Sequence, residues 1–159
     1  MTSLLRHAIV FHVLALVAAL AGAQAADAAA QPQVHVVKFG AYTLRANAIQ
    51  CNVLPTSMAR QHGIECATDR GVLNLAILER KPDGRDVTVP AEVSVRQENL
   101  LGQSEAIKMR AIEENGSVSY LGTFGFASRR NFRFAISARP VASDKALTIK
   151  FEARFLVRN

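Results

Sequence analysis

The sequence has no tryptophan, and its 159 residues include only two cysteines, five prolines and nine glycines. The low proline and glycine counts exclude collagen and low-complexity repeats. Half of the residues are hydrophobic, which excludes a disordered polymer because such chains are poor in apolar residues. The length excludes a large multidomain enzyme and favours one domain.

Motifs of common catalytic and nucleotide-binding sites are also missing. The sequence has no G-x-S-x-G, no H-E-x-x-H, no P-loop and no C-x-x-C. Beyond the N-terminal segment, only His35 and His62 remain as histidines. We therefore expect no catalytic residues and no cofactor. A small hydrolase that uses His35 or His62 remains an alternative, because the members of a catalytic triad meet in space rather than in sequence.

Residues 1–25 have the pattern of a secretory signal peptide. Arg6 and His7 precede an apolar run at 8–20, and Ala23-Gln24-Ala25 matches a cleavage site. The run is short for a permanent membrane anchor. We expect export to the periplasm by a cleavable signal peptide, with no transmembrane segment afterwards. An uncleaved signal that tethers the protein to the membrane is the alternative.

The rest of the chain has no linker or internal repeat that would mark a second domain. We expect residues 26–33 to form a flexible leader and residues 34–159 to form a single β-sandwich domain. Apolar and polar residues alternate along most of this part, which predicts β-strands. The expected strands are 34–39, 42–49, 71–80, 87–95, 105–114, 117–126, 132–138 and 147–157.

About eight short strands separated by turns predict an all-β fold. The one expected helix is Pro55–His62, with proline in its first turn and Gly63 at its C-terminal end. We expect an immunoglobulin-like antiparallel β-sandwich. The Cys…Trp…Cys pattern of true immunoglobulin domains is absent, because the chain has no tryptophan.

Two of these strands have distinctive compositions. Residues 71–80 are almost continuously apolar, which is typical of a strand covered on both faces. Pro90 interrupts the alternation of residues 87–95, and a proline within a strand indicates an edge position or a bulge.

Two hairpins have a predictable register. Asn115-Gly116 is typical of a type I′ turn. Centring a hairpin on this turn pairs Ala111 with Tyr120, Met109 with Gly122, and Ile107 with Phe124. A second hairpin, centred in 141–143, pairs Phe134 with Phe151 on the buried face and Arg133 with Glu152 on the outer face.

Cys51 and Cys66 are the two cysteines. In an oxidising compartment the simplest interpretation is one disulfide, which would stabilise the fold by about 3 kcal/mol for a loop of this length. Redox or metal handling through these cysteines is an alternative. Met58, His62 and Cys66 recur every four residues and are soft ligands suited to copper. Gly63 predicts that the helix ends before Cys66, so we expect no metal site.

The basic residues gather at the C-terminal end of the chain. Residues 129–159 hold eight basic and two acidic side chains, whereas residues 26–128 hold ten basic and eleven acidic ones. We expect a basic face that meets an anionic envelope component or an acidic protein. A solvated edge is the alternative, and nucleic acid is a poor partner because no aromatic residues interleave with the cations. The expected face consists of Arg129, Arg133, Arg139, Lys150, Arg154 and Arg158.

Several short segments, in order, resemble the bacterial domain-of-unknown-function family 4426, which consists of small exported proteins. They include Asn47-Ala48-Ile49, the run from Arg70 to Asn74, the run from Asn99 to Gln103, Arg110 with Ile112, Phe132-Arg133-Phe134, and the closing strand Leu147 to Phe155. The resemblance implies an exported, periplasmic β-domain without an assigned activity. The two cysteines stand where the family has ordinary residues.

The resemblance also singles out polar residues that a buried core does not explain. These are Asn47, Arg70, Asn74, Gln103 and Arg110. One hypothesis is that some of them line a single binding groove at the helix end of the sandwich. The alternative is that they form turns and bond the backbone of loops, as most polar side chains do.

Overall fold

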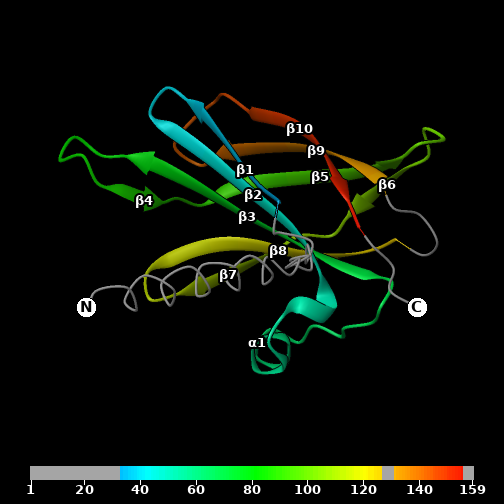
Figure 1. The fold of residues 1–159 in the computed structure, drawn as a ribbon. Coiled ribbons are helices and arrows are strands. Elements are labelled where there is room, and N and C mark those ends of the chain that lie inside the picture. The colour runs from blue at the N-terminus through cyan, green and yellow to red at the C-terminus, as the bar shows by residue number, and fades with distance from the viewer. Residues whose placement is uncertain (1–32, 127–130, 156–159) are drawn as a thin grey trace, which may run out of the picture.

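The computed structural model describes residues 33–126 and 131–155. They form two antiparallel sheets packed face to face, with one short α-helix beside the larger sheet (Figure 1). The larger sheet has the order β1-β2-β3-β8-β7, with β4 paired to β3, and the smaller sheet has the order β10-β9-β5-β6. The expected all-β sandwich is therefore confirmed.

The larger sheet contains β1 (Gln33–Phe39), β2 (Tyr42–Gln50), β3 (Arg70–Arg80), β4 (Asp86–Thr88), β7 (Arg110–Glu114) and β8 (Ser117–Gly125). The smaller sheet contains β5 (Ala91–Asn99), β6 (Ser104–Ile107), β9 (Asn131–Pro140) and β10 (Leu147–Arg154). A 3-10 turn, η1 (Cys51–Val53), and the helix α1 (Thr56–Gln61) lie between β2 and β3.

The core lies between the sheets, where alternate residues of each strand point inward. Every second residue of β10 is buried, beginning at Leu147. Phe134 lies opposite Phe151 as expected, with ring centroids 5.2 Å apart. Phe124 of the larger sheet packs against Phe134 at 5.1 Å. Aromatic rings from both sheets therefore join the two layers.

The strand β3 is covered on both faces only in its first half. Its inward residues are buried in the sandwich, and Val72 on the outer face is buried beneath the helix region. Asn74, two residues further along the same face, is exposed. The expectation that both faces of this strand are buried is therefore correct at Val72 and wrong at Asn74.

Pro90 marks the point where the chain leaves one sheet and joins the other. Before it, β4 pairs with β3 of the larger sheet, and after it, β5 pairs with β9 of the smaller sheet. The expected single strand 87–95 is therefore two strands, and Pro90 lies in the connection between them, just after the edge strand β4. A residue without an N–H suits this crossing because it needs no ladder partner.

A second crossing separates β6 from β7. Asn115 and Gly116 have φ values of +51° and +75°, which confirms the type I′ turn, and Ala111 pairs with Tyr120 as expected. The hairpin ends at Arg110, however, and Ile107 pairs with Val95 of the smaller sheet. The expected pair of Ile107 with Phe124 is therefore wrong, whereas Met109 lies against Gly122 as expected but outside the strands.

Gly122 leaves room for two side chains at this crossing. A Cβ atom on Gly122 would lie 2.5 Å from Met109 Sδ and 2.7 Å from Ile107 Cγ2. The two apolar side chains occupy the space that a side chain at position 122 would need.

A small second hydrophobic cluster holds α1 against the outer face of the larger sheet. Its buried members are Cys51, Ala59, Ile64 and Val72. The helix follows Pro55 and ends before Gly63, whose φ of +58° suits a glycine after a helix. The expected disulfide between Cys51 and Cys66 is present, with the two Cα atoms 5.2 Å apart. It fixes the segment after the helix beside the sheet.

Candidate functional site

A groove runs between the segment that follows α1 and the outer face of the larger sheet, with a volume of ≈ 440 Å³. We call it the cationic groove. It is lined by Gly63, Ile64, Glu65, Arg70, Lys108, Arg110, Leu121, Gly122 and Thr123. Its wall at residues 63–65 is held by the burial of Ile64 and by the neighbouring disulfide at Cys66.

Strand register brings distant residues to this face of the sheet. Asn47 pairs with Asn74, Asn74 with Leu121, and Leu121 with Arg110, so the four side chains form one row across β2, β3, β8 and β7. Arg70 lies on the same face of β3, four residues before Asn74. A row of this kind cannot be recognised without knowing which strands are neighbours.

The charges of the groove are unbalanced. Arg70, Lys108 and Arg110 are exposed and line it together, and Glu65 is its only carboxylate. Within residues 33–126 and 131–155, none of these three cations forms a hydrogen bond or an ion pair. Guanidinium and ammonium groups without protein partners are suited to bind carboxylates or phosphates.

Only some of the polar residues that the sequence singles out line this groove. Arg70 and Arg110 line the cationic groove, and Asn47 and Asn74 lie beside it in the same row. Asn47 Oδ1 is buried and has no hydrogen-bond partner in the described parts of the chain. Gln103 is elsewhere, in the connection between β5 and β6, where it accepts a hydrogen bond from Asn99 Nδ2 at 2.8 Å.

Sequence reasoning missed Lys108 and Glu65. Lys108 and Arg110 are separated by one residue, a spacing that puts two side chains on the same side of an extended segment. That spacing is the one available indication of a paired cationic site. Glu65 follows the helix, and nothing in its local sequence points to the groove.

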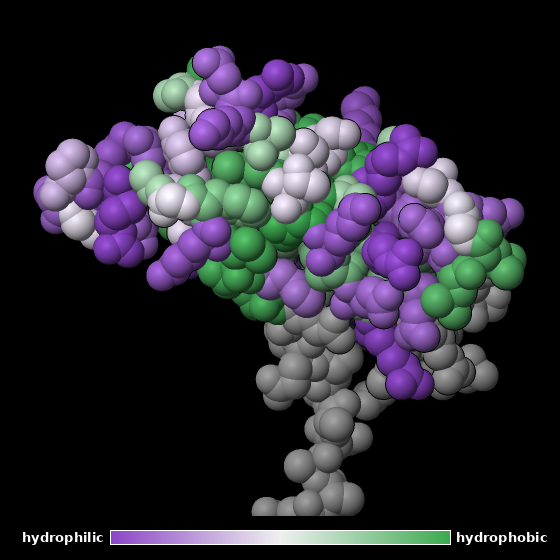
Figure 2. Space-filling view, turned by 90° about the horizontal axis from the view of Figure 1, so that it is seen from above, coloured by the Kyte–Doolittle hydropathy of each residue, from purple (hydrophilic) through white to green (hydrophobic). Residues whose placement is uncertain are grey.

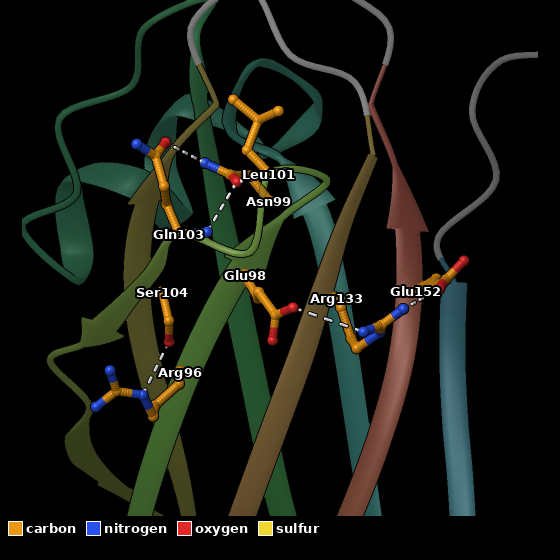
Figure 3. A network of polar contacts seen from close by, with 8 residues as sticks. All are labelled: Arg96, Glu98, Asn99, Leu101, Gln103, Ser104, Arg133 and Glu152. Atoms are coloured by element: carbon orange, nitrogen blue, oxygen red, sulfur yellow. Dashed lines mark hydrogen bonds and ion pairs between the residues drawn. The ribbon is translucent and has the colours of Figure 1, made fainter.

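The expected basic face lies on the outer side of the smaller sheet, and glutamates neutralise part of it. Arg133 lies between Glu98 and Glu152, with N···O distances of 3.6 and 3.2 Å (Figure 3). Arg139 pairs with Glu92 at 2.6 Å. Lys150 and Arg154 are exposed. Arg129 and Arg158 lie outside the described residues.

An apolar tip adjoins this face. Leu100 and Leu101, in the connection between β5 and β6, are 80% and 71% exposed. Figure 2 shows green atoms at the end of the molecule where Figure 1 places this connection. Asn99 Oδ1 accepts hydrogen bonds from the backbone N–H groups of Leu101 and Gln103, so the tip has a defined shape.

The two histidines occupy different surroundings. The ring of His35 stacks on Phe151 with centroids 3.9 Å apart, and burial lowers the pKa of His35. His62 Nε2 lies 3.8 Å from Glu114 Oε1. Among the residues that the structure describes, neither imidazole hydrogen-bonds to a serine or threonine hydroxyl.

The cysteines do not form the metal site that was considered. Because Cys66 is joined to Cys51, it is not available as a thiolate beside Met58 and His62. The described ranges contain no group of three or more His, Cys, Asp or Glu side chains placed to hold a metal ion. In the same ranges, no helix has the length and apolar character needed to cross a membrane.

The model of the DUF4426 family, a domain of unknown function, matches residues 36–157. The fold resembles PA0388 of Pseudomonas aeruginosa PAO1, a DUF4426 family protein, with a TM-score of 0.66 and 21% identity over 79% of this chain and 97% of that one. Among curated proteins, none matches this chain.

The fold also resembles FetP of uropathogenic Escherichia coli strain F11, which was expressed in the periplasm. The TM-score is 0.58 and the identity 15%, over 80% of this chain and 97% of FetP. A copper-bound FetP variant matches with a TM-score of 0.56 and 13% identity, over 80% of this chain and 97% of the variant. At these identities the likeness concerns the fold.

Proposed function

Because this chain belongs to the DUF4426 family, whose function is unknown, we propose a role from the geometry of its own residues. The protein is an exported, periplasmic, non-catalytic module that binds an anionic ligand in the cationic groove. Three features support export: the signal-peptide pattern of residues 1–25, the disulfide, and the periplasmic expression of the structurally similar FetP.

The observation that carries the proposal is the convergence of Arg70, Lys108 and Arg110 on one groove with a single carboxylate. Like charges that face each other repel, so a cluster of this kind is unfavourable unless an anion or solvent compensates it. Ile64 and Leu121 add apolar surface to the same groove. The groove therefore suits a small carboxylate or phosphate compound with an apolar part.

Copper is bound by the FetP variant, and the described residues of this chain do not favour the same ligand. Copper sites use imidazole, thiolate or thioether donors. The described residues bring no three His, Cys, Asp or Glu side chains together, and both cysteines are in the disulfide. A hydrolase built on His35 or His62 is not favoured, because neither imidazole hydrogen-bonds to a serine or threonine hydroxyl among the described residues.

Calorimetric titration of the purified protein tests the proposal, with citrate and inorganic phosphate as separate probes. We expect at least one probe to bind, and Arg70→Gln and Arg110→Gln each to weaken it about tenfold or more, as expected for a lost charged hydrogen bond. Arg45→Gln is the matched control, since Arg45 is exposed on the same face of the same sheet but outside the groove.

The two probes distinguish a carboxylate site from a phosphate site. If the control variant and the groove variants weaken binding equally, the effect is one of net charge and the groove has no special role. If neither probe binds the wild-type protein at millimolar concentration, the proposed anion site is wrong.

A further inference from the structure

The outer face of the smaller sheet carries three successive rows of polar side chains across β5, β9 and β10. The strand registers align one row of hydroxyls, one row with a cation at each end, and one row of alternating charges. We call this the three-row surface. Its rows are Ser94–Ser137–Thr148, Arg96–Ala135–Lys150, and Glu98–Arg133–Glu152.

A hollow of ≈ 530 Å³ lies on this surface. Ala135 lies in the middle of the cation row, and its side chain is smaller than those of Arg96 and Lys150 on either side. The space between these two cations is therefore open. The other lining residues include Glu98, Ser104, Arg133 and Glu152. The hollow therefore has cations on two sides and carboxylates at one end.

Several of these side chains are held in place by their neighbours. Arg96 donates a hydrogen bond from Nε to Ser104 Oγ at 2.9 Å, so its terminal nitrogens remain available (Figure 3). Arg133 is held between Glu98 and Glu152. Lys150 forms no ion pair within the described ranges. The available positive groups are thus those of Arg96 and Lys150, on opposite sides of Ala135.

The geometry points to an anionic saccharide, such as a sugar phosphate or a uronic acid, as the ligand of this hollow. An anionic group between Arg96 and Lys150 would be bound by two cations. Sugar hydroxyls donate and accept hydrogen bonds, so they match the Glu98 and Glu152 carboxylates and the Ser104 hydroxyl, which line the hollow. The hydroxyl row lies next to the hollow, beyond the cation row.

The carboxylates distinguish this ligand from a bare anion. Glu98 and Glu152 repel a phosphate ion that has no other groups, whereas a ligand with hydroxyl donors gains hydrogen bonds from them. The cationic groove on the larger sheet has three cations, one carboxylate and apolar surface, so it favours anions without sugar hydroxyls. The two sites therefore differ in ligand class as well as in position.

Heteronuclear NMR titration with glucose 6-phosphate, glucose and inorganic phosphate tests this inference. The experiment uses the Arg70→Gln/Arg110→Gln double variant as well as the wild type, so that binding in the cationic groove is removed. We expect glucose 6-phosphate to shift the backbone signals of β5, β9 and β10 in both proteins, and to bind at least tenfold more tightly than glucose or phosphate.

Three variants locate the binding. Ala135→Leu fills the hollow without changing any charge, and Lys150→Gln removes one cation; each should weaken glucose 6-phosphate binding at least fivefold. Lys145→Gln, in the exposed connection before β10, removes the same charge outside the hollow and should have no effect.

Inorganic phosphate binding as tightly as glucose 6-phosphate would overturn the saccharide assignment. Unchanged binding in a folded Ala135→Leu variant would overturn the location. Loss of all shifts in the groove double variant would mean that the sugar phosphate binds the cationic groove and not this surface.

Discussion

The phenol oxygen of Tyr120 bonds both backbone groups of Ala91. It accepts a hydrogen bond from the Ala91 N–H at 2.6 Å and donates one to the Ala91 carbonyl at 2.8 Å. Tyr120 belongs to the larger sheet, and Ala91 is the first residue of the smaller sheet after the crossing at Pro90. One hydroxyl therefore ties the two layers together where the chain passes between them.

Removing this hydroxyl should destabilise the protein. Tyr120→Phe leaves an N–H and a carbonyl of Ala91 without these partners, and we expect a loss of about 1–3 kcal/mol in the free energy of unfolding. Urea denaturation followed by circular dichroism measures it. Tyr42→Phe is the control, since the Tyr42 hydroxyl has no hydrogen bond in the described structure; equal losses in the two variants would contradict the role given to Tyr120.

Gly71 should tolerate no side chain. It lies directly opposite Phe124, and a Cβ atom at position 71 would collide with the Phe124 ring. We expect Gly71→Ala to cost about 1–3 kcal/mol through displacement of the ring. Gly125→Ala, one residue beyond Phe124, meets no atom within 4 Å and should be nearly neutral. Thermal melting of both variants checks the difference, and a neutral Gly71→Ala would show that the ring can move freely.

His35 should make stability depend on pH in the weakly acidic range. Burial against Phe151 lowers its pKa below the usual value of 6.5, so the unfolded chain takes up the proton at a higher pH than the folded chain does. The stabilisation is therefore complete above pH 6.5 and is lost as the pH falls through the lowered pKa of the folded state.

The comparison of His35→Phe with the wild type between about pH 7.5 and pH 5 measures this effect. The variant keeps an aromatic ring on Phe151 and should lose less stability than the wild type over that interval. The pKa values of Asp83 and Asp86 are also lowered, but from 3.8, so their contribution is lost only at more acidic pH. Equal slopes in the two proteins would exclude His35 as the source.

The disulfide should stabilise both the fold and the cationic groove. It closes a 15-residue separation, so Cys51→Ala/Cys66→Ala should lower the free energy of unfolding by about 3 kcal/mol. Residues 63–65 form one wall of the groove next to Cys66, and their hydrogen exchange should increase in the variant. Exchange in β9 and β10, on the opposite sheet, serves as the internal reference, and a uniform increase would mean global destabilisation only.

Local patterns predicted most of the strands and both hairpin registers near their turns. A type I′ turn requires positive φ at two successive residues, and Asn115 and Gly116 adopt it readily, so this turn type follows from the sequence. The pairing of Phe134 with Phe151 follows from alternation and from a short connection. These features depend on neighbours in the chain, which a sequence displays directly.

The crossings and the cationic groove could not be predicted in this way. Val89 and Ala91 continue one alternating pattern, although they flank the crossing between two sheets. Alternation specifies which face of a strand is buried but not which strand lies beside it. Lys108 joins Arg70 only because β7 pairs with β8 and β8 with β3, a relationship between segments far apart in the chain.

The chain passes from one sheet to the other three times, between β4 and β5, between β6 and β7, and between β8 and β9, and this determines how the molecule comes apart. Each passage joins a strand of one sheet to a strand of the other, so the layers cannot move far apart while the strands at both ends of the connection stay paired. Neither sheet consists of one continuous stretch of chain that could remain intact alone. We therefore expect unfolding to be a single all-or-none event, in which fluorescence of the tyrosines and far-ultraviolet dichroism change together.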